Sequence, residues 1–249
     1  MSGNILITGG AKRIGADLAR AMAVQGWHVC VHYNRSEAEA ADLVAEIEKA
    51  GGRATTLRAD LSDSEALEPL IAASTKAGPL TCLVNNASIF EYDALASLSA
   101  DMLDRHYAVN LRAPMLLARA FATQLPNGTN GNIVNILDNK VLAPNPDYLS
   151  YTLSKFALKS ATETLAMAVA PAIRVNAIAP GITLLSGEQS ETRFEKAHAT
   201  NPLNQGCTPA QIAAALKLIL DCPAMTGEII TIDGGQRLQK LPRDIAFLT

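Results

Sequence analysis

Seven short apolar runs alternate with helical patterns along the chain, and this alternation constrains the fold more than any other feature. The runs are mostly apolar at successive positions rather than at every second one. This pattern indicates strands buried on both faces, as in a parallel sheet covered by helices. The runs lie at residues 4–8, 28–33, 53–59, 80–84, 132–137, 174–178 and 228–232. The sequence therefore predicts a doubly wound α/β fold with a seven-stranded parallel sheet.

The helical patterns fill the intervals between these runs. They occupy residues 14–25, 37–50, 63–76, 101–123, 151–169 and 209–220. Ser62 and Glu65 have the spacing of a capping box at the start of the third pattern. No linker or repeat interrupts the alternation, so we expect residues 1–249 to form one domain. The polar segment 183–204 is expected to act as a mobile substrate lid, and residues 239–249 form a C-terminal tail.

The composition favours a globular protein that acts on small molecules. The chain is 49% hydrophobic and 18% charged, with a formal net charge of −3. This balance provides no basic surface for nucleic acid or for an anionic membrane. No basic leader and no apolar run of about 18 residues is present, so we expect a cytoplasmic protein. Its four cysteines are widely spaced without a CxxC pair, which favours reduced thiols and no metal site.

A glycine-rich turn, TGGAKRIG at residues 8–15, follows the first apolar run directly. Glycines at such a turn let the backbone approach a pyrophosphate, and the next helix supplies N–H donors and a favourable dipole. The turn predicts a Rossmann-type dinucleotide site. Its expected cofactor-binding residues are Thr8, Gly9, Arg13, Ile14 and Gly15.

The end of the second run indicates which dinucleotide binds. NAD-specific sheets usually close their second strand with a carboxylate that bonds the ribose 2′-hydroxyl, but here the strand closes with HYNRS at residues 32–36. Arg35 and Ser36, with Lys12 or Arg13, offer charge-assisted donors suited to a 2′-phosphate. The sequence therefore predicts NADPH as the cofactor. The residues of this stretch expected to bind it are His32, Asn34, Arg35 and Ser36.

Tyr151 and Lys155 are four residues apart within a helical pattern. They therefore share one helix face, where the ammonium group can lower the pKa of the tyrosine towards useful proton transfer. This spacing predicts Tyr151 as a proton donor assisted by Lys155.

The order of these motifs resembles the short-chain dehydrogenase/reductase family over residues 5–238. Between the glycine turn and the tyrosine lie Asp60-Leu61, Asn85-Asn86-Ala87 and Asn110, and Pro180-Gly181 follows. The resemblance implies an adenine contact at Asp60 and Leu61, a ribose contact at Asn86 and Ala87, and a water-linked proton relay from Asn110 to Lys155. It also implies that Pro180 and Gly181 flank the nicotinamide, with Ile182 among the cofactor-binding residues. Relatives commonly form homotetramers through the helices at 101–123 and 151–169, which implies the same here.

Two residues depart from the family pattern: Arg13 replaces a glycine, and Asp138 replaces the usual catalytic serine. A serine hydroxyl can donate to a ketone oxygen as negative charge develops there, whereas an ionised aspartate can only accept and would repel that oxygen. An ordinary ketone substrate is therefore disfavoured. Reduction of a ring C=N bond must protonate nitrogen, and a carboxylate beside Tyr151 can hold a proton relay or bind a substrate N–H group.

The same departures, with HYNRS at 32–36 and NASIF at 86–90, resemble the pteridine reductases within that family. The resemblance implies that Phe90 stacks on a pterin and that Arg13 and Ser88 bind its polar edge and the cofactor phosphate. The substrate-binding set is then Arg13, Ser88, Phe90, Asp138 and Tyr151, and the catalytic set is Tyr151, Lys155, Asp138 and Asn110.

Three functions stay open from the sequence. The first is an NADPH-dependent pterin reductase that acts on a dihydropterin-type substrate. The second is a short-chain reductase of another C=O or C=N substrate, because the expected lid carries little sequence information. The third is a non-catalytic, NADPH-binding regulator, against which the intact Tyr151 and Lys155 argue.

Overall fold

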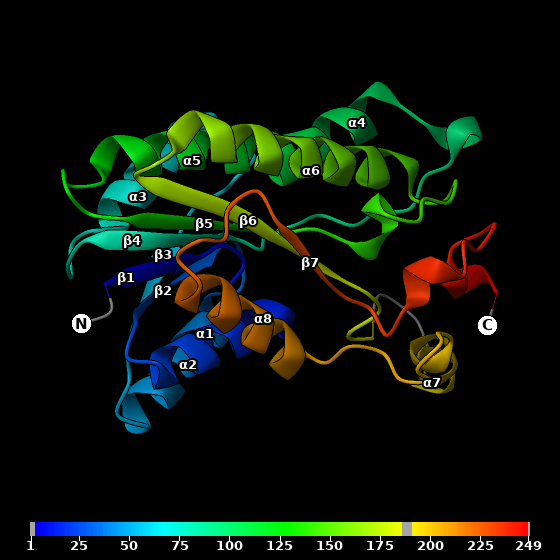
Figure 1. Ribbon diagram of the computed structural model, residues 1–249, viewed down its shortest axis with the longest axis horizontal. Coiled ribbons are helices and arrows are strands. Elements are labelled where there is room, and N and C mark those ends of the chain that lie inside the picture. Colours follow the sequence, from blue (N-terminus) through cyan, green and yellow to red (C-terminus); the bar gives the residue numbers. More distant parts are fainter. Residues whose placement is uncertain (1–2, 186–190, 249) are drawn as a thin grey trace.

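The seven predicted strands form one parallel sheet in the computed structural model, which describes residues 3–185 and 191–248 (Figure 1). Their order is β3-β2-β1-β4-β5-β6-β7, so the order reverses between β1 and β4, as in a doubly wound Rossmann-type sheet. The predicted fold class is confirmed. The strands are β1 (Asn4–Ile7), β2 (His28–Tyr33), β3 (Arg53–Arg58), β4 (Leu80–Asn85), β5 (Gly131–Ile136), β6 (Ile173–Pro180) and β7 (Ile229–Ile232).

Helices cover both faces of this sheet (Figure 1). One face carries α1 (Arg13–Val24), α2 (Glu37–Lys49) and α8 (Pro209–Asp221), and the other carries α3 (Leu67–Ser74), α4 (Ala100–Tyr107), α5 (Ala113–Gln124) and α6 (Leu149–Val169). Ile5 and Ile7 pack into the core on the first face and Leu6 into the core on the second, because successive strand side chains point to opposite faces. Double burial explains the continuous apolar runs. Within residues 3–185 and 191–248, no helix is both long and apolar enough for a membrane span.

The prediction of a single helix at residues 101–123 is wrong in the middle of that range. The structure has α4 and α5 there, separated by a π-helical segment at Ala108–Arg112. A π turn adds one residue to a helical turn and occurs frequently at functional sites. The apolar pattern changes too little across one such turn to reveal it.

The predicted capping box at Ser62 and Glu65 is also wrong. The Asp63 carboxylate accepts a hydrogen bond from the Glu65 backbone N–H at 3.0 Å and begins a 3₁₀ turn that precedes α3. The Ser62 hydroxyl instead donates to Asp60 at 2.7 Å. Two cap-forming side chains stand next to each other here, and the ionised one is the stronger acceptor for a backbone N–H.

The expected lid at residues 183–204 contains a helix, α7 (Glu191–Ala199), that the sequence analysis did not predict. Residues 186–190 of this segment lie outside the described residues. The C-terminal tail forms a 3₁₀ turn at Ile245–Phe247, which contacts α7 beyond the end of the sheet (Figure 1). Both segments therefore lie at the sheet edge where ligands of doubly wound folds bind.

Candidate active site

A cavity of about 1080 Å³ opens beyond the carboxyl ends of the central strands. Most of the predicted site residues line it: Gly9, Arg13, Ile14, Gly15, His32, Asn34, Asp60, Leu61, Asn86, Ala87, Ser88, Phe90, Asp138, Tyr151, Lys155, Pro180, Gly181 and Ile182. Four other predicted residues, Thr8, Arg35, Ser36 and Asn110, are not part of the lining. Residues far apart in the sequence thus meet in one cavity.

The glycine turn is fixed to the end of β4 by hydrogen bonds. The Thr8 hydroxyl accepts from the backbone N–H groups of Asn86 at 2.9 Å and Ala87 at 3.0 Å, and the Asn86 amide donates to the Thr8 carbonyl at 2.9 Å. At Gly15, an added Cβ would lie 2.2 Å from the Gly9 carbonyl oxygen, so only glycine fits. This packing leaves the N-terminus of α1 open to the cavity, as a phosphate site requires.

His32 lies beneath the glycine turn rather than projecting freely into the cavity. Its Nδ1 accepts from the Gly9 backbone N–H at 2.9 Å, and its Nε2 lies 3.2 Å from the Ala59 carbonyl oxygen. Nε2 therefore carries the proton, because a carbonyl can only accept. Burial lowers the pKa of His32 to about 4. His32 is a neutral support for the turn, and a direct cofactor contact stays a prediction.

Asp60 follows β3 and lines one end of the cavity. Ser62 donates to its carboxylate from both the hydroxyl and the backbone N–H. These bonds, and more weakly the charge of Arg35, lower the pKa of Asp60. Arg35 therefore lies close to this end of the cavity although it does not line it.

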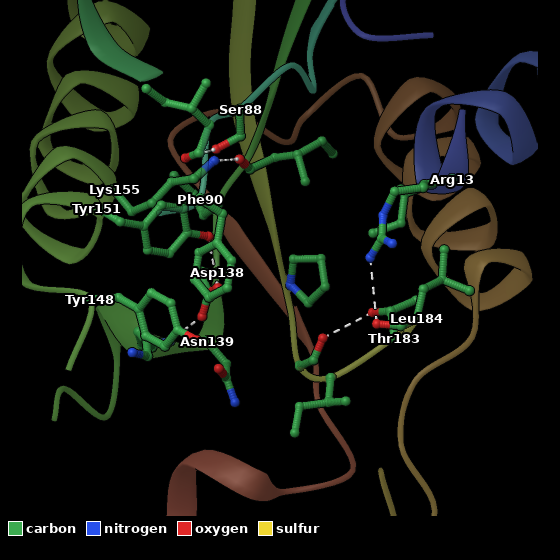
Figure 2. Close-up of a pocket in the computed structure, with 18 of the residues that line it drawn as sticks. Arg13, Ser88, Phe90, Asp138, Asn139, Tyr148, Tyr151, Lys155, Thr183 and Leu184 are labelled. Atoms are coloured by element: carbon green, nitrogen blue, oxygen red, sulfur yellow. Dashed lines mark hydrogen bonds between the residues drawn. The ribbon is translucent and has the colours of Figure 1, made fainter. Parts of the chain in front are cut away.

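Arg13 adopts the left-handed backbone conformation, with φ at +54°. This conformation costs an L-residue with a side chain about 1–2 kcal/mol, which explains why glycine is usual at this position. The guanidinium donates to the carbonyl oxygen of Leu185 at 2.6 Å. It also donates to that of Leu184 at 3.4 Å, on the side of the cavity opposite Tyr151 (Figure 2). Arg13 thus joins the start of α1 to the expected lid.

Tyr151 and Asp138 form the polar centre of the cavity (Figure 2). The Tyr151 hydroxyl donates to Asp138 Oδ2 at 2.8 Å, while Oδ1 accepts from the Lys140 backbone N–H at 2.8 Å. The Lys155 ammonium donates to the Ile136 carbonyl at 2.8 Å and lies 5.7 Å from the centre of the Tyr151 ring. The carboxylate, rather than the ammonium, is the direct partner of the phenol.

This partner reverses the expected pKa change of Tyr151. Burial, then the negative charge of Asp138 and the hydrogen bond to it, raise the pKa of Tyr151 well above its usual value. Burial lowers the pKa of Lys155 to about 8, against a smaller opposite effect of Asp138. Tyr151 therefore keeps its proton at neutral pH, as a proton donor must.

Asn110 connects the end of β4 to α6. Its side-chain oxygen accepts from the Ser88 hydroxyl at 3.1 Å and the Ile89 N–H at 3.0 Å, and its amide donates to the Ser154 hydroxyl at 3.0 Å. The π-helical segment brings this side chain into the gap between the two elements. Asn110 positions the surroundings of Tyr151, and its proton relay to Lys155 stays a prediction.

An aromatic wall lies beside Tyr151. Phe90 is 44% exposed and stacks on Tyr148, with centroids 4.1 Å apart and planes 16° apart (Figure 2). It meets Tyr151 edge-on at 4.7 Å, and Tyr92 meets Tyr148 edge-on at 5.2 Å. Tyr148 and Tyr92 were not predicted from the sequence. The position of Tyr148, three residues before Tyr151, was the available signal.

The C-terminal tail closes the outer end of the cavity. Its lining residues are Leu241, Arg243, Asp244, Ile245 and Ala246. The sequence predicted no role for this tail, and no local pattern of the tail signals one. The cavity therefore combines predicted strand ends with a tail that only the folded chain brings there.

Known proteins share both this sequence pattern and this fold. Residues 3–196 match the family described as short chain dehydrogenase. The chain is similar to the crystal structure of FolM alternative dihydrofolate reductase 1 from Brucella suis in complex with NADP, with 40% identity, a TM-score of 0.92, and 94% of this chain and 95% of that chain covered. It is 29% identical to pteridine reductase 1 of Leishmania tarentolae, over 94% of this chain and 96% of the relative.

A third similar protein has a different type of substrate. The promiscuous reductase LugOII, which catalyses a keto-reduction at C1 during lugdunomycin biosynthesis, has a TM-score of 0.84 and 32% identity, with 95% of this chain and 98% of that chain covered. The match over most of the chain, together with the glycine turn, the Tyr151–Lys155 helix and the sheet order, leads to one conclusion. The chain belongs to the short-chain dehydrogenase family.

Proposed function

We propose that this protein is an NADPH-dependent reductase of a pterin, with a dihydropterin-type ring as substrate. One observation carries the proposal: the Tyr151 hydroxyl donates to Asp138 at the foot of the aromatic wall that contains Phe90. A protonated phenol, a carboxylate and an exposed aromatic face suit a flat ring rich in nitrogen. Similarity to the Brucella dihydrofolate reductase and to the Leishmania pteridine reductase supports this substrate class.

The cofactor is NADP(H). Similar reductases were crystallised with NADP, and this chain has no carboxylate where an NAD-specific strand usually ends. The turn at Gly9 and the start of α1 would hold the pyrophosphate. Arg35 and Ser36 would hold the 2′-phosphate, with Lys12, which pairs with Glu39 in the structure.

Bound NADPH supplies the hydride, and the residues of this chain orient the substrate and provide the proton. Phe90 offers one ring face for stacking, with Tyr148 supporting it from behind. Asp138 accepts a hydrogen bond from the Tyr151 hydroxyl and keeps that hydroxyl at the cavity. Tyr151 then turns its proton from Asp138 to a ring nitrogen, which leaves a phenolate. The phenolate takes a proton back from solvent by way of the Asp138 carboxyl group.

Two other functions compete with this proposal. The keto-reduction by LugOII makes a ketone substrate the second candidate, but the Asp138 carboxylate would repel the oxyanion that forms during ketone reduction. A non-catalytic regulator would have no need of the buried Lys155 beside Tyr151. The homotetramer and the substrate-lid role of residues 183–204 stay predictions.

The proposal is tested by mixing the protein with NADPH and a dihydropterin, dihydrofolate or simple ketones, while NADPH absorbance is followed. We expect turnover of the pterin-type compounds. Tyr151→Phe should lower that turnover by about two orders of magnitude while NADPH binding stays intact. Tyr107→Phe, at the end of α4, is the matched control. Turnover of ketones alone would support the second candidate, and NADPH binding without any turnover would support the regulator.

A further inference from the structure

Two ion pairs join the C-terminal tail to residues 138–148. Arg243 forms a bidentate salt bridge with Asp147, with Nη2 2.7 Å from Oδ1 and Nε 2.7 Å from Oδ2. Lys140 Nζ lies 2.8 Å from Asp244 Oδ2. The Asp244 backbone N–H also donates to Asp147 Oδ2 at 2.7 Å. Segments about a hundred residues apart in sequence are therefore connected at several points.

Three of the four charged side chains in these contacts are mostly buried, whereas that of Arg243 is 47% exposed. The side chains of Asp147, Lys140 and Asp244 are 3%, 7% and 14% exposed. Buried charges are tolerated only where geometry and hydrogen bonds compensate for lost water. Lys140 meets this condition, because its ammonium also donates to Asn145 Oδ1 and to the Asp147 carbonyl. The two cations and two carboxylates fix the relative position of the two segments.

The connected segment contains groups that the proposed function requires. It begins at Asp138, the partner of Tyr151, and ends at Tyr148, the residue on which Phe90 stacks. The Lys140 ammonium lies 4.9 Å from the centre of the Tyr148 ring. The tail also contacts the aromatic wall, since the ring centroids of Phe247 and Tyr92 are 5.2 Å apart.

We propose that the C-terminal tail, residues 239–248, completes the substrate end of the active site. Arg243 and Asp244 are positioning residues in this arrangement: they hold residues 138–148 so that Asp138 and Tyr148 keep their places. The inference rests on the proposed function for the identity of the substrate. The arrangement of tail and segment is independent of it.

The position of the tail determines which kinetic parameter it affects. The turn at Gly9 and the residues Asn34 and Asp60 lie at the ends of β1, β2 and β3, whereas the tail contacts the segment after β5. Loosening the tail should therefore weaken pterin binding and leave NADPH binding unchanged. A general loss of folding would instead weaken both together.

The test uses the full-length protein carrying Asp244→Asn, with Asp221→Asn as the matched control. Asp221 pairs with Lys217 on the exposed surface of α8. We expect the Michaelis constant for a dihydropterin to rise about tenfold in Asp244→Asn and the NADPH dissociation constant to change less than about twofold. Amide hydrogen exchange in residues 139–143 should become faster in the same variant.

Phe247→Ala is a second variant that removes a ring 46% exposed, so it decides the question if Asp244→Asn does not fold. It too should raise the Michaelis constant and leave NADPH binding intact. The hydrogen-exchange readout needs no substrate, so it still decides the tail arrangement if the wild-type protein fails to reduce pterins. An unchanged Michaelis constant with unchanged exchange, or equal weakening of pterin and NADPH binding, would overturn the inference.

Discussion

Asp138 determines what Tyr151 can do. In place of a hydroxyl, a carboxylate accepts a hydrogen bond from the Tyr151 phenol at 2.8 Å. Burial and this carboxylate together raise the pKa of Tyr151. The Tyr151 phenol is therefore protonated, and its hydroxyl is directed at Asp138. Lys155 is not needed to hold it in this orientation. A serine at this position would offer the substrate a donor, whereas Asp138 offers an acceptor.

Asp138→Ser should lower turnover of a dihydropterin by about tenfold or more, because it removes the partner that orients the Tyr151 proton. The same change removes two causes of the raised pKa of Tyr151, the charge and the hydrogen bond, so that pKa should fall. Activity on a simple ketone should rise, since a hydroxyl donor replaces a repelling charge. Rate measurements across pH with both substrates check this. Unchanged pterin turnover would exclude Asp138 from the reaction.

Phe90→Ala should raise the Michaelis constant for a dihydropterin about fivefold, because an aromatic contact contributes on the order of 1 kcal/mol beyond its buried area. Phe90→Leu is the matched control, since it keeps apolar volume but loses the ring face. Initial rates at varied pterin concentration provide the measurement. If both variants bind pterin as the wild type does, stacking on Phe90 is not part of recognition.

Arg35→Ala should weaken NADPH binding by about tenfold or more and NADH binding hardly at all, because a charged donor to the 2′-phosphate is lost. Arg35 lies beside Asp60, near one end of the cavity, so the loss is local. Titration with both cofactors measures the difference. Equal weakening would show that Arg35 does not distinguish the two.

At the scale of elements, the sequence predicted what periodicity encodes. The run at 174–178 became β6 at Ile173–Pro180, and the pattern at 209–220 became α8 at Pro209–Asp221. Burial on both sheet faces leaves a continuous apolar run, which is readable without a structure. The π-helical segment at Ala108–Arg112 and the helix α7 were missed. One changes the helical period by a single residue, and the other is polar on most of its surface.

His32, in β2, joins the glycine turn after β1 to Ala59 after β3. Its pKa makes this junction sensitive to pH. Its folded-state pKa is about 4, below the usual value of about 6.5. Between these values the unfolded chain binds more protons than the folded one, so stability is lost as pH falls from about 6.5 to 4. From pH 7 to 5 this effect amounts to about 2 kcal/mol.

Urea unfolding of the wild type and His32→Gln at pH 7 and pH 5 tests this dependence. Glutamine can still accept from the Gly9 N–H and donate to the Ala59 carbonyl, but it does not titrate. His32→Gln should therefore lose less stability than the wild type between these pH values. Equal losses would mean that His32 is not the group responsible.

At the scale of the whole molecule, the cavity could be predicted only in part. The strand ends that carry Gly9, Asn86 and Asp138 follow from the predicted parallel sheet, because carboxyl ends of parallel strands share one edge of the sheet. The tail and Tyr148 depend on long-range packing instead. The contact between Asp147 and Arg243 joins residues 96 positions apart, and no periodic pattern encodes such a pairing.

The pair of Lys140 and Asp244 should also contribute to global stability. Lys140→Met leaves the Asp244 carboxylate without its partner where it is only 14% exposed, and breaking a buried pair typically costs about 3–5 kcal/mol. The double variant Lys140→Met/Asp244→Leu leaves neither charge buried alone, so it should lose less than the sum of the two single variants. Lys217→Met, in the exposed pair with Asp221, should cost less than about 1 kcal/mol. Urea unfolding of Lys140→Met, Asp244→Leu, their double variant and Lys217→Met provides the measurement. Strictly additive losses in the first three would show that the tail is not held by this pair.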